Sequence, residues 1–372
     1  MFNRFQNIFW FFWLLLFKKS AKKVPKKPKK IIFVYMGKLG DMVCITPVFR
    51  AVKEKYPNIE IIVFGDNVNK NLLEGNLDVD QYYIFSNIKT IISDLKSIEP
   101  DFGIIISPDF KFLISLLRAN VPGISVSKVV GGFTPYETRP YKILRSKCFV
   151  AEHQMGNYAP GEYFRLLEPL RIPFPENARL LSKNLYFSKE AGEKMEKVVL
   201  EFKKNSEKVV GVMVSTGNKI KEWPKENFVG LIKRIKENYN FTVLLLGTKN
   251  DLSLANEINK EVEVKNLAGV FNLDEFKALV SKIDLVIGVD TGPIYVAEAF
   301  GTPTIDILGP MAENEQPPIG AKHLVVKIER EKPELHIMNA RVYDWNEARR
   351  QIEEISPELV FEAFKKLFPI EK

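Results

Sequence analysis

The sequence contains few cysteines and few histidines. Its two cysteines, Cys44 and Cys148, are too few for the disulfide framework of a small secreted domain. Its three histidines, His153, His323 and His336, are scattered, and neither residue type shows the spacing of a metal site. We therefore expect neither a disulfide-stabilised scaffold nor a metal centre built from these ligands.

Two nucleotide-binding motifs are absent as well. The chain has neither G-x-G-x-x-G nor G-x-x-x-x-G-K-[ST], which disfavours a nicotinamide-dependent dehydrogenase and a P-loop nucleotidase. The sequence Asp78-Val79-Asp80 has the form of the D-x-D metal motif of some sugar transferases, but it stands in a polar turn before an apolar segment. We interpret it as a solvated turn, and no bound metal or other cofactor is predicted.

Acidic residues are missing from the first 30 positions, which hold Arg4 and eight lysines. This segment carries +9 and the whole chain +8, so residues 31–372 sum to −1. The basic character therefore belongs to a tail. The remainder of the chain shows no general excess of positive charge for binding nucleic acid.

The tail also contains ten consecutive apolar residues, 8–17 (IFWFFWLLLF). As a helix they would be about 15 Å long, half of the roughly 30 Å hydrocarbon core, which is too short to span a membrane. A secretory signal peptide has an apolar core of this length, but no small-residue cleavage site follows and the positive charge is on the wrong side. A shallow anchor followed by a polybasic linker fits better, with a disordered tail as the alternative.

Residues 1–30 are thus predicted to hold the protein on the inner face of the cytoplasmic membrane, as a peripheral protein. Pro25 and Pro28 should keep the linker extended rather than helical.

The rest of the chain has the composition of a globular protein, since 46% of all residues are hydrophobic and 27% are charged. Apolar segments with β-branched residues alternate with helical periodicity, which predicts parallel sheets covered by helices. We predict two Rossmann-like, doubly wound α/β domains facing a cleft, residues 31–184 and 185–372, with a C-terminal helix. A helix is expected over about 152–171, and a proline-bearing link over 172–180.

Residues 283–310 (IDLVIGVDTGPIYVAEAFGTPTIDILGP) predict a strand, a polar turn, a short helix and a second strand. The turn contains Asp290, Thr291, Gly292 and Pro293, and proline suits the first turn of a helix. At the carboxyl end of a parallel strand and the amino end of a helix, free N–H groups and the helix dipole favour an anion such as phosphate. The alternative is an ordinary turn without a ligand.

Two similar turns lie in the second predicted domain. Residues 215–224 follow an apolar strand and contain hydroxyl groups and the lysines Lys219 and Lys221, which can neutralise a diphosphate without a metal. A solvated loop is the alternative. Residues 247–251 follow the next strand, and Asp251 there either binds a ribose or caps its helix.

The first predicted domain has two candidate segments. Residues 37–41 form a glycine-bracketed turn between a strand and a helix, and Asp41 acts there either as an N-cap or as a general base facing the cleft. Residues 134–147 have weak periodicity and carry Arg139 and Arg145. We predict a loop at the cleft edge that meets acceptor phosphates or carboxylates, or else a solvated surface loop.

Three segments resemble glycosyltransferase family 9, the ADP-heptose:lipopolysaccharide heptosyltransferase type. They are IIFVYMGKLGDMVCITPVFRAVKEKYPNIEI, the KEWPKENF stretch after STG, and GVDTGPIYVAEAFGTPTIDILGP. The resemblance implies a GT-B fold. It also implies a metal-independent, inverting transfer of a heptose or similar sugar from an ADP-sugar to a lipopolysaccharide core or another lipid-linked glycan.

The resemblance further implies roles for individual residues. Asp41 would deprotonate the acceptor hydroxyl, and Lys221 would hold the diphosphate. Gly40 joins Arg139 and Arg145 in the expected acceptor site. The donor contacts would come from Ser215, Thr216, Lys221, Gly247, Asp251, Asp290, Thr291, Gly292, Pro293 and Tyr295.

Two features depart from the family pattern. Tyr295 stands where members often carry histidine, and the basic tail is unusual, so the donor sugar and the acceptor stay open. The alternatives are a GT-B transferase with another nucleotide sugar and a non-catalytic nucleotide-sugar-binding protein at the membrane. Substitution of Asp41 or Lys221 would abolish sugar transfer if the protein is a transferase. The function of a non-catalytic binding protein would tolerate the same substitutions.

Overall fold

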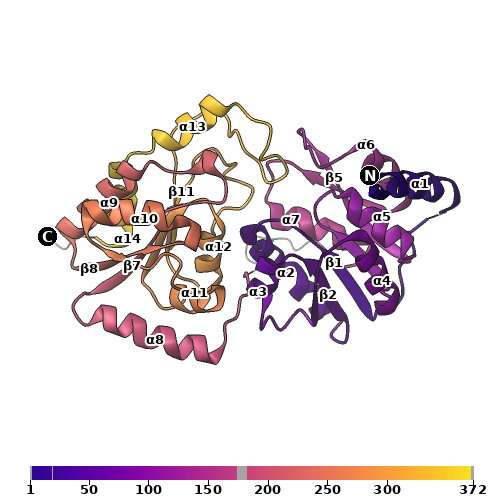
Figure 1. The fold of residues 1–372 in the computed structure, drawn as a ribbon, viewed down its shortest axis with the longest axis horizontal. Helices are drawn as coiled ribbons and strands as arrows, with labels where there is room; N and C mark the ends of the chain where they lie inside the picture. Colours follow the sequence, from indigo (N-terminus) through magenta and orange to yellow (C-terminus); the bar gives the residue numbers. More distant parts are fainter. Residues whose placement is uncertain (1, 19, 174–181, 370–372) are drawn as a thin grey trace. The chain divides into compact units, whose positions relative to one another are not determined.

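The computed structural model describes residues 2–18, 20–173 and 182–369 (Figure 1). By its internal contacts the chain divides into two compact units. The described residues within Met1–Lys38, Cys44–Leu181 and Ile337–Arg341 form the first unit. Those within Leu39–Val43, Ser182–His336 and Val342–Lys372 form the second.

The first unit is built on six parallel strands in the order β3-β2-β1-β4-β5-β6. Its inner strands are buried, which explains why their sequences are runs of aliphatic and aromatic residues rather than alternating patterns. The strands are β1 (Lys30–Val34), β2 (Glu60–Gly65), β3 (Gln81–Ile84), β4 (Phe102–Ile105), β5 (Gly123–Val130) and β6 (Phe149–Gln154). The helices are α1 (Phe2–Phe17), α2 (Leu39–Lys55), α3 (Asn67–Leu73), α4 (Ile88–Ile98), α5 (Phe110–Arg118), α6 (Arg139–Leu144) and α7 (Ala159–Phe164), with short 3-10 helices η1 (Arg145–Lys147) and η2 (Arg165–Leu170).

The second unit repeats the plan with strands in the order β12-β11-β10-β7-β8-β9, again all parallel. The strands are β7 (Lys208–Met213), β8 (Phe241–Leu246), β9 (Lys265–Asn266), β10 (Leu285–Val289), β11 (Thr304–Ile307) and β12 (His323–Val326). The helices are α8 (Lys189–Lys203), α9 (Lys225–Asn238), α10 (Leu252–Val262), α11 (Leu273–Val280), α12 (Gly292–Ala299), α13 (Trp345–Glu353) and α14 (Pro357–Leu367), with 3-10 turns η4 (Lys219–Lys221) and η5 (Lys249–Asp251). The prediction of two doubly wound α/β domains is confirmed.

Two local predictions are wrong. Residues 152–171 are not one helix, because β6 extends to Gln154 and is followed by α7 and η2. Only His153 is buried in β6, so this edge strand lacks the apolar run by which the inner strands are recognised. Residues 134–147 are not a loop throughout, because α6 and η1 occupy 139–147. Most of the expected link, residues 174–180, lies outside the described residues.

The amino-terminal helix is longer than predicted, since α1 begins at Phe2. Among the helices of the described chain, none is long and apolar enough to cross a membrane.

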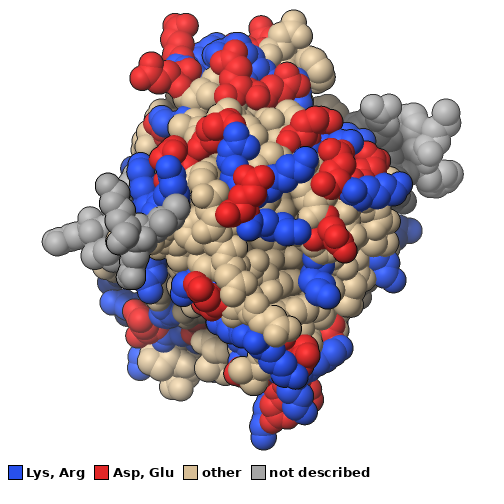
Figure 2. Space-filling view, turned by 90° about the vertical axis from the view of Figure 1, so that its left-hand side faces the viewer, with Lys and Arg blue, Asp and Glu red and all other residues tan. Residues whose placement is uncertain are grey.

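The charges on the face that Figure 2 shows are mixed, with Lys and Arg side chains interspersed with Asp and Glu. The helices of the second unit carry ion pairs of this kind, such as Lys225–Glu261 at 3.1 Å and Arg349–Glu353 at 2.6 Å. This face therefore presents no extended surface of one sign.

Candidate active site

The candidate residues of the second unit lie near the switch point of its sheet, where the strand order reverses. β7 pairs with β8 on one side and with β10 on the other, so the connections run outward from β7 in both directions. In open α/β sheets, ligands bind at the carboxyl ends of the strands beside such a switch point. The turn after β7 carries Lys221, and the turn after β10 carries Asp290.

Lys221, Asp290 and Tyr295 form a buried cluster. Lys221 Nζ lies 2.7 Å from Asp290 Oδ2 and also donates to the Asp290 carbonyl oxygen. The Tyr295 hydroxyl, from α12, donates to Asp290 Oδ1. All three residues are less than a tenth exposed. The cluster thus places an ammonium group, balanced by one carboxylate, where water screens it little.

Two anchors hold the turn that carries Lys221. The Trp223 indole N–H donates to the Ile355 carbonyl oxygen at 2.7 Å. From α13, Arg349 donates to the Glu222 carbonyl oxygen at 2.8 Å. These contacts hold the backbone immediately after Lys221, and the ammonium group itself is held by Asp290.

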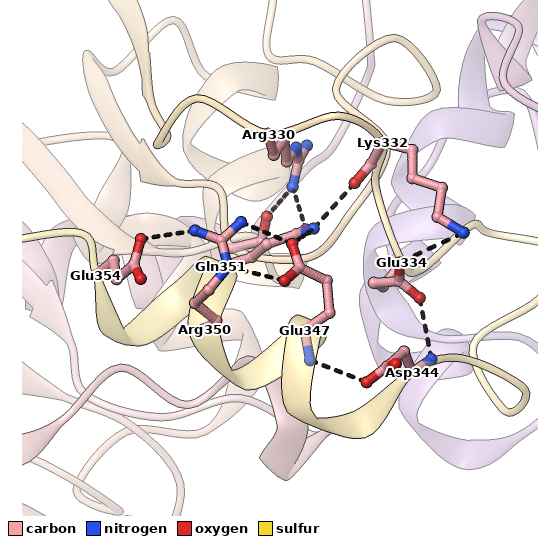
Figure 3. Close-up of polar contacts among 9 residues, drawn as sticks. Arg330, Lys332, Glu334, Asp344, Glu347, Arg350, Gln351 and Glu354 are labelled. Carbon is pink, nitrogen blue, oxygen red and sulfur yellow. Dashed lines mark hydrogen bonds and ion pairs between the residues drawn. The ribbon is translucent and has the colours of Figure 1, made fainter.

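An ionic network holds α13 in place (Figure 3). Hydrogen bonds from Arg350, at 2.7 Å, and from Gln351, at 2.9 Å, lower the pKa of Glu347 to about 2. Arg330 donates to Gln351 Oε1 at 3.0 Å and to the Met311 carbonyl oxygen at 2.5 Å, which ties the segment after β11 to α13. The network also includes Lys332, Glu334, Asp344 and Glu354.

Asp306, in the middle of β11, was not predicted from the sequence as a site residue. It is buried, and its Oδ1 atom has no hydrogen-bond partner among the described residues. Burial raises the pKa of Asp306 well above its usual range, and the charge of Asp290 raises it further, whereas Lys221 opposes the shift. Burial and the neighbouring carboxylate thus both disfavour the charged form of Asp306. The sequence signal that could have indicated Asp306 as a site residue is an acidic residue inside a strand that is buried on both faces.

A second buried ion pair adjoins Tyr295. Lys183 Nζ pairs with Glu298 Oε2 and lies 5.6 Å from the centroid of the Tyr295 ring. Glu298 Oε1 also accepts from the Ile319 N–H at 3.1 Å. Lys183 and Glu298 are 115 residues apart in the chain, so no local pattern indicated this pair.

The turn after β10 opens α12. Thr291 is the N-cap residue, with extended backbone and no side-chain cap bond, and Gly292 and Pro293 are the first two helical residues. A helix start leaves backbone N–H groups without intrahelical partners, and together with the helix dipole they attract an anion.

The hydroxyl-bearing residues Ser215 and Thr216 begin the turn after β7 and are half-buried. Thr216 Oγ1 accepts from the Asn218 N–H at 3.4 Å. Both residues follow the strand that lies next to β10, so they belong to the same edge of the sheet as Lys221.

At the end of β8, Asp251 closes a capping box. Its Oδ2 atom accepts from the Thr248 N–H at 2.6 Å and from the Thr248 hydroxyl at 2.8 Å. A Cβ atom on Gly247 would lie 2.9 Å from this oxygen, so a larger residue there would require the Asp251 side chain to shift. Of the two roles expected for Asp251, the structure displays the capping role.

Gly40 and Asp41 lie in the first turn of α2, within the segment Leu39–Val43. This helix follows β1, which pairs with β2 and β4 and so marks the switch point of the first sheet. The N-cap residue of α2 is Lys38, so the N-cap alternative for Asp41 is wrong; its carboxylate sits three residues further on. A Cβ atom on Gly37 would lie 1.7 Å from the Tyr35 hydroxyl, which explains the glycine that opens this turn.

The two predicted acceptor arginines differ in their surroundings. Arg139 is the first residue of α6 and is exposed. Arg145 pairs with Glu137 at 2.5 Å, and the same Glu137 oxygen accepts from the Val129 N–H at 2.8 Å. The Glu137 side chain is almost fully buried, and Arg145 neutralises its charge.

The described part of the chain contains no group of three or more His, Cys, Asp or Glu side chains that could hold a metal ion. Asp78 and Asp80 take part in a polar turn before β3. Asp80 Oδ2 lies 2.6 Å from Lys53 Nζ, and Asp78 lies 3.9 Å from Arg50. Both carboxylates are therefore engaged in ion pairs.

Known proteins resemble this chain in sequence and in fold. Residues 136–341, more than half of the chain, match the model of glycosyltransferase family 9 (heptosyltransferase). Lipopolysaccharide heptosyltransferase 3 of Escherichia coli K12 is 24% identical over 286 residues, which are 73% of this chain and 79% of that protein.

Two solved structures have a similar fold. The ADP-heptose lps heptosyltransferase II of E. coli superposes with a TM-score of 0.70 at 20% identity, covering 91% of this chain and 98% of that one. The E. coli heptosyltransferase WaaC with ADP-2-deoxy-2-fluoro heptose gives 0.64 at 13% identity, covering 91% and 99%. These likenesses confirm the prediction of a GT-B fold. The family match over residues 136–341 shows that this chain belongs to glycosyltransferase family 9.

Proposed function

We propose that this protein is an inverting heptosyltransferase. It moves a heptose, or a similar sugar, from an ADP-sugar to a lipopolysaccharide core or another lipid-linked glycan at the inner surface of the cytoplasmic membrane. Family membership supports the reaction class, and the heptosyltransferase structure named with an ADP-heptose analogue supports the donor. The observation that carries the proposal is the buried cluster of Lys221, Asp290 and Tyr295 beside the switch point.

The donor diphosphate binds at Lys221 and at the amino end of α12. In the free protein, Lys221 is paired with Asp290. A diphosphate carries more negative charge than one carboxylate, so it competes for the ammonium group, while Tyr295 keeps its bond to Asp290. The remaining contacts fall to Ser215, Thr216, Gly247, Asp251, Thr291, Gly292 and Pro293.

The transfer is a direct displacement. The acceptor hydroxyl oxygen forms a bond to the anomeric carbon, its proton passes to Asp41, and the bond from that carbon to the diphosphate oxygen breaks on the opposite face. The leaving ADP gains one negative charge, which Lys221 and the α12 dipole stabilise. These groups replace the positive charge of a metal ion, so a chelator such as EDTA is expected to leave the rate unchanged.

The acceptor site includes Gly40 and the exposed Arg139, which can meet acceptor phosphates. Arg139→Gln is expected to raise the KM for the acceptor several-fold and to leave donor affinity unchanged. Lys96→Gln, which removes an exposed charge at the end of α4, is the control. An equal effect of Arg139→Gln on donor and acceptor would contradict the assignment.

The donor is tested by thermal unfolding with ADP-heptose and with UDP-, GDP- and CMP-sugars, followed by a transfer assay. A ligand that binds the folded state adds RT ln(1 + [L]/Kd), about 2.7 kcal/mol at a hundredfold excess over Kd. We expect ADP-heptose to raise the midpoint by several degrees and the other nucleotides to have little effect. Stabilisation by another nucleotide sugar instead would favour the alternative of a GT-B transferase with a different donor. Donor binding without any transfer would favour a non-catalytic binding protein.

A further inference from the structure

The part of α1 from residue 9 to residue 17 is apolar on both sides, and one side is buried against the rest of the first unit. Leu14 lies fully buried in the hydrophobic core of that unit, and Trp10 and Phe11 pack against the same core. The Arg118 guanidinium, at the end of α5, lies 4.2 Å from the centroid of the Trp10 ring. Figure 1 shows α1 beside α5 and α6, the two helices that it contacts. We call this side of α1 its inner face.

The segment that follows α1 is also attached to the first unit. Ala21 is fully buried, and its carbonyl oxygen accepts from the Ile124 N–H at 2.9 Å. Lys22 forms an antiparallel bridge with Gly123, where a Cβ atom would lie 2.3 Å from the Lys23 carbonyl oxygen. The described residues of the linker, 18 and 20–29, form no helix, as predicted, but residues 21–23 lie bound along the amino end of β5.

The opposite side of α1, its outer face, is exposed. At 100° per residue, positions 9, 12, 13 and 16 share a side of the helix that points away from position 14. Single exposed apolar side chains are ordinary on a protein surface, but a contiguous apolar patch marks an interaction surface. The outer face consists of Phe9, Phe12, Trp13, Leu15 and Leu16, whose exposed fractions range from 36% to 73%, and Phe17 at the end of the helix is exposed as well.

Positive charge accompanies the outer face. Five lysines of the segment after α1 are exposed, and no acidic residue precedes Asp41 in the chain. An apolar helix face beside a lysine cluster matches the two chemical layers of a bilayer surface, the acyl boundary and the anionic headgroups. Tryptophan is also favoured at that boundary. The lysines are Lys22, Lys23, Lys26, Lys27 and Lys29.

We propose that α1 is a fixed membrane-contact helix. Its outer face lies in the headgroup region of an anionic bilayer, while its inner face keeps it attached to the first unit. This inference extends the membrane location that forms part of the proposed function. A helix of 16 residues is about 24 Å long, which suits a helix lying in the surface rather than crossing the hydrocarbon core.

The proposal is tested by sedimentation of the full chain with phosphatidylglycerol-containing vesicles and with pure phosphatidylcholine vesicles. Phe12→Ser combined with Leu16→Ser removes two side chains of the outer face and leaves Trp10 and Leu14 in place. The matched control, Val270→Ser with Leu359→Ser, removes two exposed apolar side chains of the second unit. Circular dichroism melting checks that both double variants are folded.

We expect the unsubstituted chain and the control to bind the anionic vesicles with equal affinity. The affinity of the outer-face variant should be at least about tenfold lower. Replacing Lys22, Lys23, Lys26 and Lys27 by glutamine should weaken binding to anionic vesicles roughly fivefold per lysine near the surface, less at high salt. The same replacement should change binding to phosphatidylcholine little.

Two outcomes would overturn the proposal. One is vesicle binding by the outer-face variant equal to that of the unsubstituted chain. The other is a dimer in analytical ultracentrifugation that the outer-face substitutions dissociate, without a change in vesicle binding, because the patch would then join two copies of this chain.

Transfer to a short, lipid-free acceptor is measured in parallel without vesicles. If this transfer persists while no variant or parent binds vesicles, the membrane proposal alone fails. If vesicle binding follows the expected pattern but no transfer occurs with any nucleotide sugar, the proposed function fails and the membrane contact stands.

Discussion

Replacing Asp41 by asparagine is expected to lower the rate of sugar transfer by roughly 10²–10⁴-fold while the fold and donor binding are retained. Asparagine has nearly the shape of aspartate but cannot accept the proton of the acceptor hydroxyl. The loss of a negative charge from the first turn of α2 should cost only about 0.3–1 kcal/mol of stability. The rate is measured at saturating donor and acceptor, and donor affinity by calorimetry.

A matched control for Asp41→Asn is Glu54→Gln, which removes an exposed carboxylate from the same helix. It should leave the rate unchanged. A rate for Asp41→Asn close to that of the unsubstituted enzyme would reduce Asp41 to a charge that stabilises the start of α2.

Replacing Lys221 by methionine is expected to have two separable effects. Transfer should fall roughly 10²–10³-fold, because the leaving diphosphate loses its counter-charge. Stability should also fall, by about 3–5 kcal/mol, because Asp290 is left buried without its partner. Chemical denaturation measures the second effect, and a transfer assay measures the first.

The double variant Lys221→Met with Asp290→Asn separates these effects. Removing both charges should restore part of the stability, since no unpaired charge stays buried, whereas transfer should stay low. Lys219→Met, which removes an exposed lysine from the same turn, is the control and should alter neither property strongly. If Lys221→Met destabilises the protein but lowers transfer less than about tenfold, the ion pair is structural and the diphosphate is held elsewhere.

In the proposed donor site, Lys221 and Asp290 form an ion pair. The sequence resemblance assigns both residues to the donor site, but as separate contacts. In the structure they neutralise each other, and Tyr295 holds the second carboxylate oxygen. In the proposed donor site, binding of the diphosphate would exchange the partner of Lys221, and Asp290 and Tyr295 would act as positioning residues.

Several parts of the fold were predictable because their signals are local. The strands of 31–34 and 285–289 are short apolar runs, and a helix begins within a few residues of each. Glycine, proline and aspartate between a strand and a helix also indicated the turns where site residues stand. β6 and α6 were missed because half-exposed elements carry weak periodicity.

The sequence by itself determined the two α/β units, the βα turns that bear Asp41, Lys221 and Asp290, and the apolar and basic character of the amino-terminal segment. All of these depend on residues within one element or turn, where periodicity and turn chemistry act directly.

Only the tertiary structure decided which turns are neighbours. Lys221 and Asp290 are 69 residues apart, and they meet because β7 and β10 are adjacent in the sheet. The same holds for Asp306, whose pKa is raised by burial and by the charge of Asp290, and for α1, whose inner face is covered by α5 and α6. Burial and charge pairing over such separations depend on strand order and helix packing, which no local pattern encodes.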